Sequence, residues 1–174
     1  MDMGKVEIED VRANSSWAPA VSILETFMPK IDPKYFVGIR KIVLLDKDYH
    51  RDKRVQATGR YIPIEGTRGG DIELYLEYLS ELPDEAKNSR MYLTYRILKT
   101  LAHELYHHRV RGQRIERRPK FEQEQKRADQ WAAKIVKPIF AEVFPREKYE
   151  SEWVLIQQKL TESRKGGESD SKVR

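Results

Sequence analysis

The pattern of apolar residues changes once along the chain, and this change limits the possible folds more than any other feature. Three segments of the first half have strand character and cover residues 36–45, 55–64 and 71–76. From Ser89 onward, the apolar residues repeat with the period of a helix. Strands first and helices afterwards predict an α+β fold, in which a small antiparallel or mixed sheet of about three strands packs against helices.

The connections between the expected elements are short and rich in turn residues. They predict that the three strands form an antiparallel meander, with Pro63 at a sheet edge because proline has no N–H to donate. The expected helices cover residues 17–28, 89–112, a long segment from Pro119 with breaks around Pro138 and Pro145, and 147–160. Their buried faces should include Leu98, Leu101 and Leu105 on one helix, and Phe121, Ala128, Ala132, Ile135 and Ile139 on the next.

Composition limits the class of protein and its chemistry. The chain has 174 residues, and 39% of them are hydrophobic, which is enough for one modest core over residues 1–160, followed by a disordered charged tail over 161–174. It has no cysteine, so a metal would need histidine and carboxylate ligands. No apolar run spans a bilayer and the start has no signal-peptide core, so we expect a cytoplasmic protein. The high charge content is typical of thermophiles.

The most specific motif is a cluster of histidines on the expected helix 89–112. The segment His103-Glu104-Leu105-Tyr106-His107-His108 contains H-E-x-x-H. Residues four apart on a helix differ by about 40° around its axis, so His103 and His107 point the same way and can bind one cation such as zinc. Glu104 is rotated by about 100° and can reach a water on the open side of the metal, where a general base belongs. The alternative is that both are surface histidines.

Other polar residues leave their roles open. His108 is expected to be a surface or packing residue and His50 to lie in a turn. A phenol that stabilises an oxyanion could come from Tyr75, Tyr78, Tyr92, Tyr95 or Tyr106, although core packing is the commoner role of such residues. The basic residues between 109 and 120 form either a solvated connector or a patch for an acidic partner or nucleic acid: Arg109, Arg111, Arg114, Arg117, Arg118 and Lys120.

These motifs resemble those of the gluzincin metallopeptidases, in particular the minigluzincins and the catalytic domains of the CaaX prenyl protease and of HtpX-type membrane proteases. The resemblance covers roughly residues 36–140. It implies a zincin-like fold in which residues 71–76 form an exposed edge strand that binds a peptide substrate in extended form. It also implies that the helix after the H-E-x-x-H helix supplies the third zinc ligand.

The downstream motif of the family resembles E-x-x-A-D-x-x-A, in which the Glu binds zinc and the Asp orients a ligand histidine. Here the segment reads Gln125-Lys126-Arg127-Ala128-Asp129-Gln130-Trp131-Ala132, so glutamine replaces the ligand glutamate. Around the helix, Asp129 lies about 40° from Gln125, Glu122 about 60° and Glu124 about 100°. We take Asp129 and Glu124 as the leading candidates for the third ligand. Glu122 is a further candidate, and the amide oxygen of Gln125 would be a weak one.

Two functional hypotheses follow from these residues. The first is a zinc metalloendopeptidase in which His103 and His107 hold Zn²⁺ and Glu104 acts as general base on a water, with a peptide or protein as substrate. The second is a zincin scaffold that lost turnover with its ligand glutamate. Such a scaffold would bind a protein, or a nucleic acid through residues 109–120.

Overall fold

The computed structural model describes residues 6–12, 19–47, 57–79, 89–110 and 118–166. Within these residues, four strands form one mixed sheet with the order β1-β2-β4-β3. Strand β2 runs parallel to both β1 and β4, whereas β3 is antiparallel to β4. The strands are β1 (Glu7–Asp10), β2 (Ile39–Leu45), β3 (Gly59–Pro63) and β4 (Gly70–Tyr75). The α+β class is confirmed, and β1 is a strand that the sequence analysis missed because it is short and mostly acidic.

The strand order differs from the predicted meander. Strand β4 pairs with β2 on one side and with β3 on the other, so the prediction that residues 71–76 form the edge strand is wrong. Among the residues described, β3 pairs only with β4 and therefore forms that edge, and Pro63 lies on it as predicted. The polar and apolar alternation of Asp71 to Leu74 has another cause, because β4 has one face on the core and one polar face.

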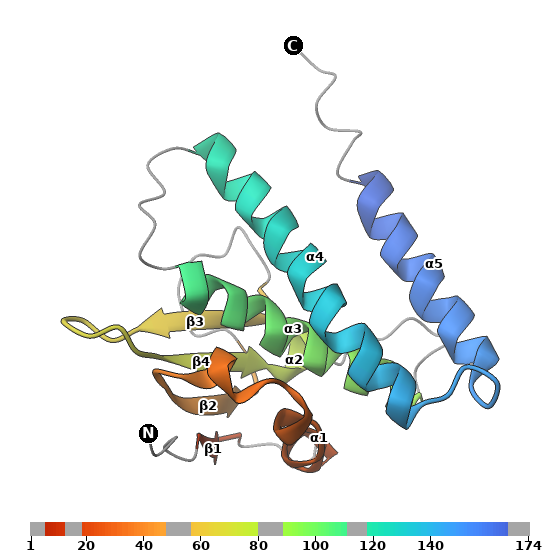
Figure 1. Ribbon diagram of the computed structural model, residues 1–174, viewed down its shortest axis with the longest axis horizontal. Coiled ribbons are helices and arrows are strands. Elements are labelled where there is room, and N and C mark those ends of the chain that lie inside the picture. The colour runs from red at the N-terminus through yellow and green to blue at the C-terminus, as the bar shows by residue number, and fades with distance from the viewer. Residues whose placement is uncertain (1–5, 13–18, 48–56, 80–88, 111–117, 167–174) are drawn as a thin grey trace.

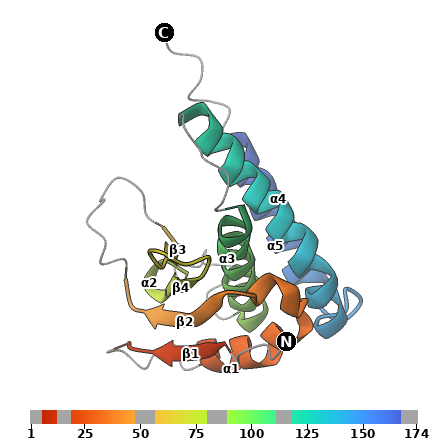
Figure 2. The ribbon, with the colours of Figure 1, turned by 60° about the vertical axis from the view of Figure 1, so that its left-hand side comes forward.

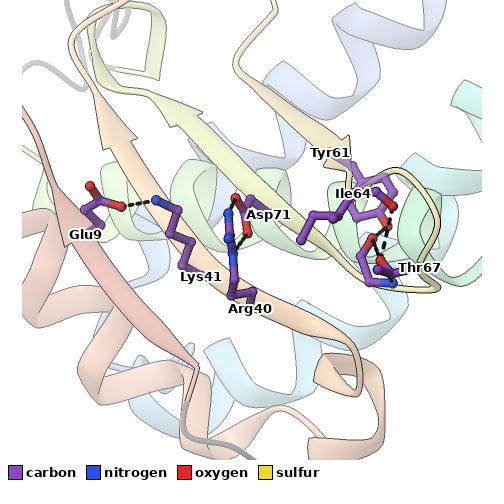
Figure 3. Close-up of polar contacts among 8 residues, drawn as sticks. Glu9, Arg40, Lys41, Tyr61, Ile64, Thr67 and Asp71 are labelled. Atoms are coloured by element: carbon purple, nitrogen blue, oxygen red, sulfur yellow. Dashed lines mark hydrogen bonds and ion pairs between the residues drawn. The ribbon is translucent and has the colours of Figure 1, made fainter.

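The polar face of the sheet carries ion pairs between neighbouring strands. Arg40 of β2 donates from Nε to Oδ1 of Asp71 on β4 over 3.0 Å, and Lys41 of β2 pairs with Glu9 of β1 (Figure 3). These charged pairs lie on the side of the sheet opposite the apolar core. These ion pairs account for the charged residues that interrupt the hydrophobic sequences of β2 and β4.

The helices lie mainly on the other side of the sheet. They are α1 (Pro19–Phe27), α2 (Leu76–Leu79), α3 (Arg90–Val110), α4 (Arg118–Val143) and α5 (Glu150–Gly166), with 3₁₀ helices at Met28–Lys30 and Pro33–Phe36. Figure 1 shows α3 crossing the sheet, and Figure 2 shows α3 between the sheet and the pair α4 and α5. No helix in the described part of the chain is long and apolar enough to cross a membrane.

The core forms where α3 contacts the sheet and α4. Leu98, Leu101 and Leu105 are buried as predicted, and each fully buried leucine contributes about 1.5–3 kcal/mol of transfer free energy. Ala128 and Ala132 of α4 are also buried. Phe121, in contrast, is 56% exposed, and the described contacts of α4 with the core continue through Val136 and Phe140.

Two helix boundaries differ from the predictions. Helix α4 continues through Pro138, where we predicted a break. Pro138 and Lys134, the residue whose carbonyl the proline leaves without its helical partner, both lie on the exposed side of α4, where water can bind that carbonyl. Helix α5 continues past Leu160 to Gly166, so the first residues of the predicted disordered tail are helical. The rest of that tail, residues 167–174, lies outside the described residues.

Candidate active site

Three polar side chains converge where α3 crosses α4. The Nε2 atoms of His103 and His107 lie 3.0 Å apart. The side-chain oxygen of Gln125 lies 2.9 Å from Nε2 of His103, and its side-chain nitrogen lies 3.2 Å from Nε2 of His107. The buried Ala128 and Ala132 on α4 have small side chains that let the two helices approach closely enough for this contact.

The other nitrogen of each imidazole faces a carboxylate of α4. Oδ1 of Asp129 lies 3.2 Å from Nδ1 of His103, and Oε1 of Glu124 lies 3.0 Å from Nδ1 of His107. Asp129 also pairs with Lys99, whose Nζ lies 3.3 Å from the same Oδ1. Both carboxylates therefore hold the histidines on the Nδ1 side, whereas Gln125 occupies the Nε2 side.

This network assigns the protons of the two rings. A carboxylate only accepts, so both Nδ1 atoms carry a proton. The amide nitrogen of Gln125 only donates, so Nε2 of His107 accepts, and Nε2 of His103 can then donate to the oxygen of Gln125. This assignment makes His103 an imidazolium, whose single Nε2 proton lies between two acceptors, the oxygen of Gln125 and Nε2 of His107.

The electrostatic environment agrees with a cationic His103. Burial lowers the pKa of His103, but its hydrogen bond to Asp129 and the nearby Glu104 carboxylate outweigh burial and hold that pKa above its ordinary value. Burial raises the pKa of Asp129, while His103 and Lys99 lower it by more, so the net shift is downward. A cation that binds at Nε2 of His103 must displace this proton.

Glu104 lies on the adjacent flank of α3, against strand β3. Its side chain is buried, and Oε2 accepts a hydrogen bond of 2.8 Å from the main-chain N–H of Tyr61. Burial raises the pKa of Glu104 above its ordinary value, although His103, His107, the Tyr61 N–H and Arg60 act in the other direction. A buried carboxylate whose pKa is raised is a stronger proton acceptor than an exposed one and can act as a general base.

Strand β3 lies close enough to α3 for this contact because of Gly59. A Cβ atom at Gly59 would lie 2.6 Å from Cγ2 of Thr100 on α3 and 3.0 Å from the carbonyl oxygen of Glu73 on β4. The adjacent Thr58 contacts the same Thr100 through their hydroxyl oxygens, 3.2 Å apart. The glycine therefore fixes the edge strand beside the helix that carries Glu104.

Three atoms at the crossing of α3 and α4 are of the kind that zinc binds, namely Nε2 of His103, Nε2 of His107 and the side-chain oxygen of Gln125, whereas the amide nitrogen that faces His107 cannot bind a cation. In a tetrahedral zinc site with bonds of roughly 2.0–2.1 Å, the ligand atoms lie roughly 3.3 Å apart. The separations of 3.0 Å between the two Nε2 atoms and of 2.9 Å from His103 to the oxygen of Gln125 are close to that value. The described residues contain no group of three or more His, Cys, Asp or Glu that could hold a metal ion.

The other candidate residues named in the sequence analysis do not join the cluster of His103, His107 and Gln125. Glu122 is exposed on α4, His50 lies outside the described residues, and so do Arg111, Arg114 and Arg117. Of the tyrosines, Tyr106 lies beside the His107 ring, with centroids 6.1 Å apart. Tyr75, Tyr92 and Tyr95 are buried, as is typical of core aromatics.

The sequence analysis missed Tyr61, whose main chain holds Glu104. No signal in the residue type could have revealed it, because every residue except proline offers a main-chain N–H.

Comparisons of the chain with protein-family models, with curated proteins and with solved structures give no match. The resemblance to gluzincins therefore depends on the H-E-x-x-H segment and the motif from Gln125 to Ala132.

Proposed function

We propose that this protein is a zinc-dependent metalloendopeptidase. The observation that carries the proposal is the convergence of Nε2 of His103 and Nε2 of His107, with the carboxylate of Glu104 on the next flank of the same helix. Two imidazoles and an adjacent buried carboxylate supply the two functions that metal-assisted hydrolysis requires, a cation site and a general base.

The zinc would be held by His103, His107 and the side-chain oxygen of Gln125. Asp129 and Glu124 accept from the Nδ1 atoms, which fixes the rotation of each ring and makes Nε2 a better donor to a cation. A glutamine oxygen is neutral and binds zinc more weakly than a glutamate would. We therefore expect a functional site with lower zinc affinity than one with a carboxylate ligand.

Bound zinc would lower the pKa of water and polarise the carbonyl of the scissile peptide bond. Glu104 provides the proton transfer. Its Oε2 is held by the Tyr61 N–H, so Oε1 takes the proton of the attacking water and then passes it to the leaving amine. The raised pKa of Glu104 suits both steps, since the group must accept the proton and release it within one turnover.

The peptide would bind along the edge strand β3. A chain in extended form can add to an unpaired strand edge through main-chain hydrogen bonds, which leaves sequence preference to side-chain pockets. The Tyr61 N–H on this edge is bound to Glu104 and Pro63 has no N–H, so at these positions a peptide would pair through the main-chain carbonyls of β3, beside the proposed catalytic group. This predicts cleavage of unfolded or extended segments in preference to folded ones.

The direct test is cleavage of a reduced and alkylated, permanently unfolded protein, followed by mass spectrometry. Fragments should appear with the zinc-loaded protein, disappear with a chelator and return when zinc is restored. The His103→Ala variant is the control, because it removes one proposed ligand. Equal fragmentation by that variant would identify a contaminating protease, and no fragments from a protein with stoichiometric zinc would contradict the proposal.

A second candidate is a binding scaffold without turnover. Gln125 favours it, since its amide makes hydrogen bonds to both Nε2 atoms and thereby satisfies the site without a metal. This candidate predicts less than one tenth of an equivalent of bound zinc after reconstitution and no cleavage under any condition. Nucleic acid would then be the partner to test, through salt-dependent binding.

A further inference from the structure

A hollow of about 610 Å³ opens beside the C-terminal end of α3. Three separate segments line it. Lys34 and Tyr35 come from the 3₁₀ helix Pro33–Phe36, Thr67 and Arg68 from the turn between β3 and β4, and His108 and Arg109 from α3. The volume is within the range of pockets that hold small ligands or side chains.

The lining is basic and supplies no carboxylate of its own. Lys34 pairs with Asp32, which is not part of the lining. Arg68 and Arg109 form no ion pair with any carboxylate in the part of the chain that the structure describes. Two guanidinium groups therefore face the same hollow with no anionic partner among the described residues, and guanidinium groups bind carboxylates through paired hydrogen bonds.

The aromatic wall of the hollow is fixed by α4. The Tyr35 ring packs edge-to-face on Trp131 with centroids 4.9 Å apart. Nζ of Lys34 lies 4.9 Å from the centroid of the Tyr35 ring, and the guanidinium carbon of Arg109 lies 6.0 Å from it. The ring therefore holds two cations beside the hollow.

The opposite wall is fixed by His108 and the hairpin turn. Nε2 of His108 lies 2.8 Å from the carbonyl oxygen of Val37, to which it donates, and Nδ1 lies 3.0 Å from the hydroxyl of Tyr61. The hydroxyl of Tyr61 donates to the carbonyl oxygen of Gly69 over 3.1 Å, and Thr67 donates to that of Ile64 over 3.1 Å (Figure 3). The turn that carries Arg68 is thus tied to the edge strand and to α3.

The hollow adjoins the residues that hold the proposed catalytic group. His108 follows Glu104 by one helical turn, a rise of about 6 Å, and Tyr61 contacts both, with its N–H on Glu104 and its hydroxyl on His108. Tyr61 therefore joins Glu104 to the wall of the hollow, and a peptide bound along β3 would lie near both.

We propose that this hollow is a specificity subsite for an aspartate or glutamate side chain of a peptide bound along β3, a proposal that rests on the proposed peptidase function. Arg68 and Arg109 bind the carboxylate, and the Tyr35 ring contacts its methylene groups. Because both arginines are exposed, the attraction weakens as salt concentration rises.

The test compares two synthetic peptides that differ by one residue, glutamate or glutamine, at the position where acidic residues are most enriched around mapped cleavage sites. The zinc-loaded protein should cleave the glutamate peptide with a kcat/KM about tenfold higher, which corresponds to about 1.4 kcal/mol. In the variant Arg68→Ala/Arg109→Ala, this ratio should fall to about one. Arg146→Ala is the matched control, since Arg146 is an exposed arginine that does not line the hollow, and it should keep the ratio.

Equal kcat/KM values for the two peptides, or loss of the ratio in Arg146→Ala as well, would overturn the subsite. If neither peptide is cleaved by a zinc-loaded protein, the proposed function fails, and binding then decides the subsite by itself. Heteronuclear NMR of Glu104→Gln titrated with each peptide should shift the amide signals of Thr67, Arg68 and Arg109 with the glutamate peptide. Shifts of equal size with both peptides, or shifts that persist in the double arginine variant, would overturn it.

Discussion

The two flanks of α3 around residues 103 to 108 differ in what holds their polar groups. On the flank toward α4, the described hydrogen-bond contacts of the His103 and His107 rings are with side chains, namely each other and those of Gln125, Asp129 and Glu124. On the flank toward β3, Glu104 is held by the main chain of Tyr61. The first flank depends on residue type and a single substitution can alter it, whereas the second depends on the position of a strand.

This difference separates two tasks within one helical turn. The α4 flank can gain or lose affinity for a cation without moving Glu104, and the β3 flank can lose its proton-transfer group without moving the histidines. The replacement of the expected glutamate by Gln125 changes only the α4 flank. The following substitutions should therefore affect one flank and leave the other unchanged.

The largest effect is expected for Glu104→Gln. Glutamine keeps the shape and can still accept from the Tyr61 N–H, but it cannot take a proton, so cleavage should fall by about 100- to 10,000-fold. Zinc bound per chain, measured by elemental analysis, should remain as in the wild type. Loss of zinc in this variant would contradict the separation of the two flanks.

The next effect is expected for the carboxylates behind the imidazoles. Asp129→Ala and Glu124→Ala each remove the acceptor at one Nδ1, which should weaken zinc binding by about 10- to 100-fold in a competition titration with a chromophoric chelator. Glu122→Ala is the matched control, because Glu122 is exposed on the same helix. An equal loss in that control would assign the effect to the charge of α4 as a whole.

The pH dependence should have opposite signs with and without zinc. Folding raises the pKa of His103, so the protonated side chain contributes to the free energy of unfolding of the metal-free protein. This contribution is fully present below the unfolded pKa of about 6.5 and is lost as pH rises through the folded pKa. Zinc must displace that proton, so its affinity should fall about tenfold per pH unit below the folded pKa. Urea unfolding between pH 6 and 9, with zinc or with a chelator, measures both trends. Parallel pH curves would contradict the proton assignment of His103.

The smallest effect is expected for Tyr61→Phe, which keeps the main-chain N–H but removes the hydroxyl that joins Gly69 and His108. The free energy of unfolding should fall by about 1 kcal/mol, while zinc affinity stays the same. In Tyr106→Phe, the control, no described hydrogen bond is lost, and stability should change less. A change in zinc affinity in Tyr61→Phe would show that the flanks are coupled.

Residue spacing predicted the parts of this molecule that lie on one helix. The leucine stripe of α3 and the common direction of His103 and His107 follow from the helical period alone. Spacing could not predict the strand order, because polar and apolar alternation occurs in central and edge strands alike. Spacing also could not predict which nitrogen of each imidazole ring faces a carboxylate. That depends on how α4 is oriented relative to α3, and the angles between residues around α4 do not give this orientation.

The central claim is that His103, His107 and residue 125 form one cation site, and the zinc dissociation constant of wild type and Gln125→Glu tests it most directly. Both proteins should bind one zinc per chain, and the variant should bind it at least about tenfold more tightly, because a carboxylate replaces a neutral amide oxygen beside both Nε2 atoms. Equal affinities, or zinc binding that survives His107→Ala in either protein, would contradict the claim.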